Sequence, residues 1–190
     1  MKIIILAPDS HFSKESAPIG FHTGSEIAPK VNIETPMWKG TSKFLTAIYE
    51  SQDTAPKREQ LQKVDYFFVF KRGDDRNPDI WYSRTSKLLE ILSDAEINST
   101  PYDIIISYHA MEQKEKEEKG NGFGASLKAR PREDWSLAPS KKGKFDIWKL
   151  KHVEKEYVIF DCLNPASQGK RKEDDYIFMK EISDLIHKAI

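Results

Sequence analysis

Four short apolar runs, each of strand length, constrain the fold of this 190-residue chain more than any other feature. They cover residues 1–7 (MKIIILA), 64–70 (VDYFFVF), 102–108 (YDIIISY) and 157–161 (YVIFD), and they are rich in Ile, Val, Phe and Tyr. Near-continuous apolar runs are typical of strands that are covered on both faces, as in a parallel sheet. A fifth run, residues 144–150 (KFDIWKL), is a candidate partner of the fourth run in a hairpin.

Helical patterns lie between these runs. Residues 41–50, 83–93 and 174–190 carry apolar side chains at helical spacing, and residues 56–62 form a shorter candidate helix that begins with a proline. Strands that alternate with helices predict an α/β fold, in which helices flank a mainly parallel sheet of four or five strands in Rossmann-like layers. We expect the C-terminal helix to lie across the sheet and to bury Ile182, Leu185 and Ile186.

Length and composition predict one domain over residues 1–190, with long loops at about 9–40 and 110–143. Because 30 Lys and Arg residues balance 30 Asp and Glu residues, the chain is not a bulk polycation, although a local basic patch is compatible with this balance. One cysteine excludes an intramolecular disulfide and a cysteine-based zinc cluster. No apolar run approaches the ~20 residues of a membrane span, so we expect a soluble, cytoplasmic protein without a membrane partner.

Polar side chains follow the predicted strands at the edge where open α/β sheets bind ligands. The first run is followed by Asp9 and His11, the second by Lys71, Arg72 and Asp74, the third by His109, and the last by Asp161, Lys170 and Arg171. Polar residues also end strands for a simpler reason, because the chain leaves the sheet toward solvent there. In a parallel sheet, however, all of these side chains share one edge.

These residue types predict a metal-dependent site. Imidazole and carboxylate groups are ordinary ligands of divalent cations, so the predicted ligands of Mg²⁺ or Mn²⁺ are Asp9, His11, Asp74 and Asp161. The candidate catalytic groups are Asp9, His11, His109 and Asp161, and the candidate phosphate-binding groups are Lys71, Arg72, Lys170 and Arg171. A bound cation lowers the pKa of its water ligand and so supplies a nucleophile near neutral pH. Cys162 is interpreted either as a packed apolar residue or as a nucleophile.

Two parts of the chain resemble known metal-dependent families. The first run followed by Asp9-x-His11, together with the second run leading into Gly73-Asp74, resembles the opening motifs of metallophosphoesterases. This resemblance implies that Asp9, His11 and Asp74 are metal ligands. The chain departs from that family in having neither a Gly-Asn-His-Asp/Glu element nor a His-x-His sequence.

The hairpin region is similar to the core of PD-(D/E)xK nucleases. Asp146 lies in the fifth run, and Asp161-Cys162-Leu163 ends the fourth. The resemblance implies that Asp146 and Asp161 hold magnesium beside a lysine. Leu163 stands where that family has the lysine, so Lys170 or Lys172 would have to supply the amine.

The expected function is that of a metal-dependent hydrolase acting on a phosphate ester, either a small nucleotide or a nucleic acid, and therefore a phosphohydrolase or nuclease. No Gly-x-Gly-x-x-Gly sequence follows the first run and no Walker A sequence is present, so no nicotinamide or flavin motif is found. The alternative is a non-catalytic nucleotide- or protein-binding α/β module. In that case a mobile loop containing Trp38 and Phe21 would close over the ligand. The basic stretch around Trp135 is a candidate contact for nucleic acid.

Overall fold

The computed structural model describes residues 1–7, 19–50, 56–68, 78–93, 102–108, 135–141, 145–152, 155–162, 183–184 and 186–188. The elements are β1 (Ile3–Ala7), β2 (Gly20–His22), α1 (Gly24–Ile27), α2 (Pro36–Glu50), α3 (Arg58–Gln62), β3 (Asp65–Phe68), α4 (Pro78–Ser93), β4 (Ile104–Tyr108), β5 (Trp135–Lys141), β6 (Phe145–His152) and β7 (Lys155–Cys162). Residues 183–184 and 186–188 are also helical. None of the described helices is both long and apolar enough to cross a lipid bilayer.

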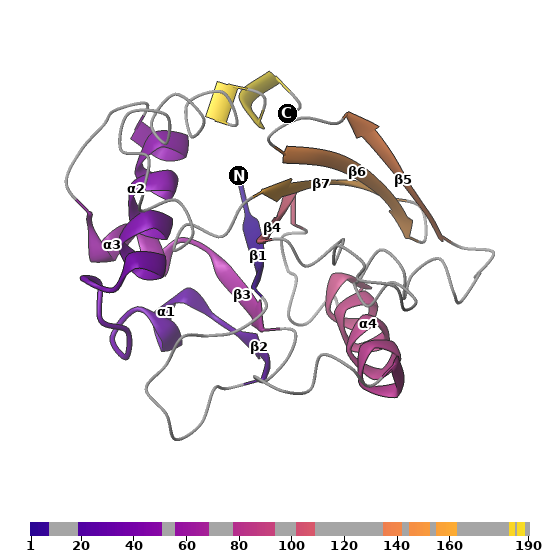
Figure 1. Ribbon diagram of the computed structural model, residues 1–190, viewed down its shortest axis with the longest axis horizontal. Coiled ribbons are helices and arrows are strands. Elements are labelled where there is room, and N and C mark those ends of the chain that lie inside the picture. Colours follow the sequence, from indigo (N-terminus) through magenta and orange to yellow (C-terminus); the bar gives the residue numbers. More distant parts are fainter. Residues whose placement is uncertain are drawn as a thin grey trace, which may run out of the picture.

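The described strands form one seven-stranded mixed sheet in the order β2-β3-β1-β4-β7-β6-β5 (Figure 1). The four central strands β3, β1, β4 and β7 run parallel, and β2, β6 and β5 pair antiparallel with their neighbours. The α/β class with flanking helices is therefore confirmed, and so is the hairpin of β6 and β7. The sheet is larger than the predicted four or five strands because β2 and β5 extend it at its two edges.

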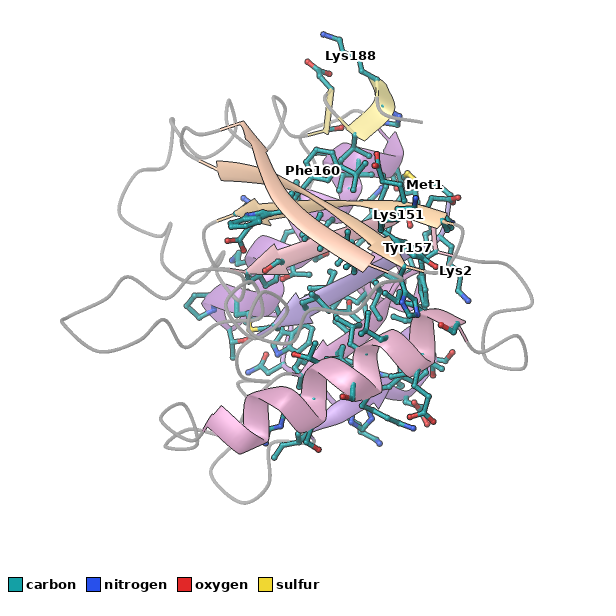
Figure 2. All side chains as sticks on the ribbon, turned by 90° about the vertical axis from the view of Figure 1, so that its right-hand side faces the viewer. Met1, Lys2, Lys151, Tyr157, Phe160 and Lys188 are labelled. Atoms are coloured by element: carbon teal, nitrogen blue, oxygen red, sulfur yellow. The ribbon has the colours of Figure 1, made fainter. Side chains whose placement is uncertain are left out.

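The two faces of the sheet carry separate apolar clusters. Successive side chains of a strand point to opposite faces, so β1 sends Ile3 and Ile5 to one cluster and Ile4 and Leu6 to the other. The helices α1, α2 and α3 cover the first cluster, α4 covers the second (Figure 1), and Figure 2 shows side chains filling the space between α4 and the sheet. Burial on both faces explains why the sequence of β1 is apolar at every position.

The prediction of a loop at about 9–40 is wrong over much of that range, because β2, α1 and the start of α2 at Pro36 lie within it. A capping box between Thr23 and Glu26 begins α1, in which each side chain bonds the backbone N–H of the other residue. A Cβ atom on Gly24 would stand 2.4 Å from the Val64 carbonyl oxygen, so α1 lies directly on the chain that enters β3. Elements of three and four residues are too short to produce a readable periodicity.

Trp38 does not lie in a ligand-closing loop as predicted. It belongs to α2, is 1% exposed, and packs edge-on against Tyr66 and Phe68 at 5.5 and 6.4 Å between ring centroids. These edge-to-face contacts are favourable aromatic geometry within a core. Phe21 lies in β2 and packs, partly buried, against the cluster under α4. Trp38 is therefore a core residue, and its prediction as a ligand-binding residue is corrected.

The predicted loop at about 110–143 also contains a strand, β5, which pairs antiparallel with β6. The pairing shifts register between Pro139 and Lys141. Proline lacks a backbone N–H and is tolerated on an edge strand, which is where β5 lies. Because Pro139 is not typical of a strand sequence, the pattern predicted a loop here. Residues 109–134 and 142–144 lie outside the described residues.

The C-terminal helical residues pack on the end of α2. The hydroxyl of Ser183 donates to the Ala47 carbonyl at 3.0 Å, and His187 Nε2 lies 2.8 Å from the Ile48 carbonyl oxygen. Ile186 is fully buried in the first apolar cluster, as predicted. The other residues expected in this core, Ile182 and Leu185, lie outside the described residues.

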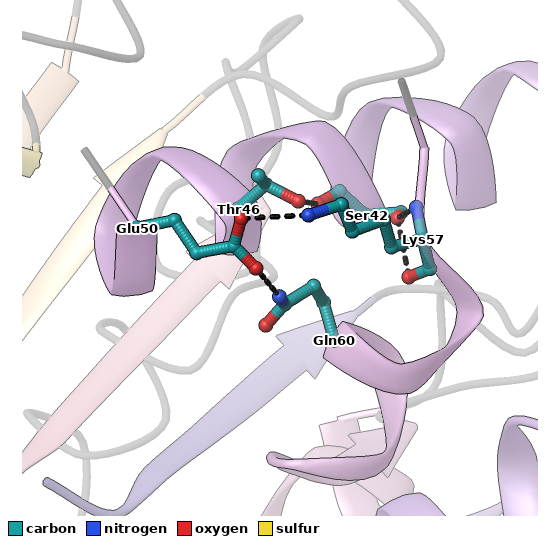
Figure 3. Close-up of polar contacts among 5 residues, drawn as sticks. All are labelled: Ser42, Thr46, Glu50, Lys57 and Gln60. Atoms are coloured by element: carbon teal, nitrogen blue, oxygen red, sulfur yellow. Dashed lines mark hydrogen bonds and ion pairs between the residues drawn. The ribbon is translucent and has the colours of Figure 1, made fainter. Parts of the chain in front are cut away.

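Polar contacts attach α3 to α2 (Figure 3). The hydroxyl of Ser42 accepts a hydrogen bond from the Lys57 backbone N–H at 2.6 Å and donates to the Lys57 carbonyl at 2.7 Å. The Glu50 carboxylate accepts from the Lys57 ammonium at 2.7 Å and from the Gln60 side-chain amide. The N-cap residue of α3, Lys57, and Gln60 within α3 are therefore both held by side chains of α2.

Candidate functional site

The connections of the four parallel strands define the edge at which a ligand is expected. Between β1 and β3 the chain forms the edge strand β2 and the helices α1, α2 and α3, which cover one face of the sheet. Between β3 and β4 it forms α4, which covers the other face. The strand order therefore reverses between β1 and β4, which are neighbours in the sheet. Ligands of open α/β sheets bind beyond the carboxyl ends of the strands at such a point. Here these ends are Ala7 and Tyr108.

A buried hydroxyl–carboxylate pair lies at this edge. Ser107 and Asp161, the penultimate residues of β4 and β7, are directly paired in the sheet. The Ser107 hydroxyl donates a hydrogen bond to Asp161 Oδ1 at 2.6 Å, and the two residues are 0% and 2% exposed. Because side chains alternate along a strand, this pair faces α4, on the same side as Ile105 and Ile159. A carboxylate thus follows four apolar residues near the end of β7.

The neighbouring residues face the other side of the sheet. The Tyr108 hydroxyl lies 3.0 Å from Thr41 Oγ1 of α2, and both residues are fully buried. Burial raises the pKa of the Cys162 thiol well above its ordinary value, and the nearby charge of Asp161 raises it further. A protonated, buried thiol is a poor nucleophile. The structure therefore favours the interpretation of Cys162 as a packed core residue.

The register also places Asp146 of β6 directly opposite Asp161 of β7. Backbone pairing thus aligns Ser107, Asp161 and Asp146 in one row across β4, β7 and β6. The resemblance to PD-(D/E)xK nucleases implied two carboxylates on adjacent strands of a hairpin, and these two residues are paired in that way. Carboxylate oxygens are suitable ligands for Mg²⁺ and Mn²⁺.

Most of the predicted site residues are not described by the structure. Those outside the described residues are Asp9, His11, Lys71, Arg72, Asp74, His109, Lys170 and Arg171. Of the predicted ligands and catalytic groups, Asp161 is the one whose surroundings can be given. Within the described part of the chain, no three His, Cys, Asp or Glu side chains are grouped closely enough to hold a metal ion.

Three residues at this edge were missed by the sequence analysis, namely Ser107, Tyr108 and Thr41. The signal for Ser107 is slight, since it is one hydroxyl-bearing residue within the apolar run 102–108. The signal for Thr41 is weaker still, because a threonine on a helix is compatible with either face. Only the pairing of β4 with β7 and the packing of α2 bring these groups to the carboxyl edge.

Searches of protein families, curated proteins and solved structures with this chain give no match.

Proposed function

We propose that the protein is a metal-dependent hydrolase that acts on a phosphate ester, a nucleotide or a nucleic acid, at the carboxyl edge of the parallel strands. The observation that carries this proposal is the carboxylate of Asp161, which accepts a hydrogen bond from Ser107 and belongs to a residue that is 2% exposed. The backbone of Asp161 is paired with that of Asp146 on the next strand. Ionisable groups buried at the ligand-binding edge of an α/β sheet are candidates for function.

The parallel centre, with helices on both faces, supports Rossmann-like layering as part of the same proposal. In this arrangement Asp9, His11 and His109 follow the two strands at which the order reverses. We propose that Asp161, with Asp9, His11 and Asp74, supplies ligands to Mg²⁺ or Mn²⁺, and that His109 acts as a base. We propose that the phosphate oxygens are bound by Lys71, Arg72, Lys170 and Arg171.

A bound cation at this edge would polarise the phosphate and lower the pKa of a water molecule. The role of Asp161 is to present a carboxylate oxygen in a fixed direction, which its burial on the face under α4 and its hydrogen bond from Ser107 support. We propose that the protein carries out this reaction in the cytoplasm.

The test compares Asp161→Asn with the wild-type protein. Hydrolysis of a phosphodiester such as bis-p-nitrophenyl phosphate, and of a panel of nucleotides, is measured with Mn²⁺, with Mg²⁺ and with a chelator. We expect activity that requires the metal and falls at least ~100-fold in the variant, because a ligand is lost. Asp103→Asn is the matched control, since Asp103 immediately precedes β4, at its amino end, and its carboxylate accepts from the Lys2 backbone N–H.

Metal-independent or absent hydrolysis, or equal rates for Asp161→Asn and wild type, would contradict the proposal. Binding of a nucleotide without turnover would instead favour the non-catalytic α/β binding module.

A further inference from the structure

We propose that the amino ends of the parallel strands form a docking surface for the phosphate backbone of a nucleic acid. We call this surface the amino edge and define it by four lysines, namely Lys2, Lys63, Lys151 and Lys155. It lies at the opposite end of the strands from the carboxyl edge, about 15 Å away for a strand of five residues such as β1. This inference goes beyond the proposed function and does not depend on it.

The strand order sets these lysines in a row. Lys63 precedes β3, Lys2 precedes β1 and Lys155 begins β7, so all three lie where parallel strands start. Lys151 lies near the end of β6, which runs antiparallel to β7 and therefore ends at the same edge. Figure 2 shows Lys2 and Lys151 at the same end of the sheet. Because neighbouring strands are about 4.8 Å apart, the row from β3 to β6 is roughly 20 Å long.

Three of the four ammonium groups lie over tyrosine rings. Measured from Nζ to the ring centroid, these pairs are Lys2 with Tyr102 at 4.4 Å, Lys155 with Tyr157 at 4.9 Å and Lys63 with Tyr49 at 5.0 Å. The Lys155 ammonium also donates to the Tyr102 carbonyl. A ring attracts a cation without neutralising its charge. These lysines are therefore positioned by the fold and still carry the charge that an anion requires.

Ion pairs within the protein do not compensate these charges. Among the described residues, no carboxylate forms an ion pair with Lys63, Lys151 or Lys155. Lys57 differs in this respect, because its ammonium lies 2.7 Å from the Glu50 carboxylate. The lysines of the amino edge thus have a different electrostatic environment from a lysine that serves to attach one helix to another.

The carboxylates at the described strand starts are fewer than the lysines. Asp65 accepts a hydrogen bond from the Tyr102 hydroxyl at 2.7 Å, and Asp103 accepts one from the Lys2 backbone N–H at 2.7 Å. The third is Glu156, which is exposed. Two of the three carboxylates are therefore engaged by hydrogen bonds within the fold, and positive charge is in excess at this edge.

A row of cations matches a linear polyanion better than it matches one small anion. A nucleic acid carries a negative charge at every nucleotide, and lysine binds phosphate as a point charge. The rings of Tyr102 and Tyr157 are not available to stack on bases, because these residues are 0% and 3% exposed. The contacts are therefore made to phosphates, which position a nucleic acid without reading its sequence.

The experiment measures binding of a fluorescein-labelled DNA duplex by fluorescence anisotropy in EDTA, between about 50 and 200 mM KCl. The edge variant combines Lys63→Gln, Lys151→Gln and Lys155→Gln. We expect its affinity to fall at least ~10-fold, and the slope of log K against log salt to become shallower by about 2–3, because each lost phosphate contact contributes about 0.9. The matched control combines Lys39→Gln, Lys43→Gln and Lys87→Gln, which removes the same charge from α2 and α4 and should change binding less than about threefold.

Equal affinities and salt slopes for the edge and control variants would overturn the inference, and so would absence of binding by the wild type at the lowest salt. Binding of a poly-glutamate peptide but not of DNA would show that the partner is an acidic protein instead. If the edge variant does not fold, Lys63→Gln with Lys151→Gln replaces it, since both side chains are exposed, and its slope should be shallower by about 1–2. Hydrolysis of bis-p-nitrophenyl phosphate, which is too small to span the row, tests the proposed function separately and should be unchanged in the edge variant.

Discussion

Burial and hydrogen bonding act in opposite directions on a carboxylate such as that of Asp161. Removing a charged group from water costs free energy, and a hydroxyl donor at 2.6 Å offsets part of that cost. The next residue, Cys162, experiences the same burial on the other face of the strand, and both burial and the charge of Asp161 raise its pKa. Two successive residues of β7 therefore present a hydrogen-bonded carboxyl group to one side and a neutral thiol to the other.

His22 gives a prediction about pH. Burial lowers the pKa of its imidazole below the ordinary value of about 6.5, with the charge of Glu26 acting in the opposite direction and that of Lys30 lowering the pKa further. The unfolded chain therefore binds the proton more readily than the folded chain. The contribution of neutral His22 to stability should be complete above about pH 6.5 and should be lost as the pH falls through the lower pKa of the folded state.

Urea unfolding between pH 5 and pH 8 measures this effect. In His22→Gln, the loss of stability on the acid side should be smaller than in wild type, because the variant has no imidazole to protonate at this position. Parallel pH curves for the two proteins would show that His22 does not contribute.

Asp161 is predictable from sequence because a carboxylate directly after an apolar run stands at the end of a buried strand. Ser107 is not predictable in the same way. Its contact with Asp161 joins residues 54 positions apart and depends on which strands are neighbours and in which register. Apolar patterns define the faces of a strand but not its partner. Trp38 was misplaced for a related reason, since a tryptophan near prolines and glycines carries no sign of the strand on which it packs.

At the scale of elements, the hydroxyl of Ser42 makes two of the hydrogen bonds that attach α3 to α2. Ser42→Ala should lower the free energy of unfolding by about 1–3 kcal/mol, because the backbone N–H and carbonyl of Lys57 both lose their side-chain partner. Urea denaturation followed by circular dichroism gives this value. Ser25→Ala is the matched control, because Ser25 is exposed on α1, and it should change stability by no more than about 0.5 kcal/mol. Equal stability of the two variants would show that water replaces the Ser42 contacts.

The elements that were predicted correctly are those whose sequences have a strong apolar pattern. The four apolar runs became β1, β3, β4 and β7, and the candidate helices at 41–50, 56–62 and 83–93 correspond to α2, α3 and α4. The missed elements are short or interrupted. β2 has three residues, α1 has four, and β5 contains Pro139 at the sheet edge. These segments are held in place by their neighbours in the fold, so their own sequences carry little signal.

At the scale of the whole molecule, residues from both ends of the chain complete one core. Ile186 is fully buried in the same cluster as Ile3 and Phe44. Ile186→Ala should therefore lower the free energy of unfolding by about 2–5 kcal/mol, because the lost side chain leaves a cavity in this cluster. Lys188→Ala is the control, since Lys188 is exposed and points away from the molecule (Figure 2).

Urea denaturation of both variants gives the comparison. If Ile186→Ala is as stable as Lys188→Ala, the C-terminal residues do not close this core.

The place of β1 has a consequence for synthesis on the ribosome. β1 lies between β3 and β4, and its residues pair with Asp65 on one side and with Ile104 on the other. A nascent chain therefore exposes this apolar segment long before either neighbour has been translated, and β7 follows later still. Exposed apolar segments of incomplete domains are prone to aggregate, and chaperones bind them. β1, which has a parallel neighbour on each side in the finished sheet, is thus the strand that needs protection for the longest time while the chain is made.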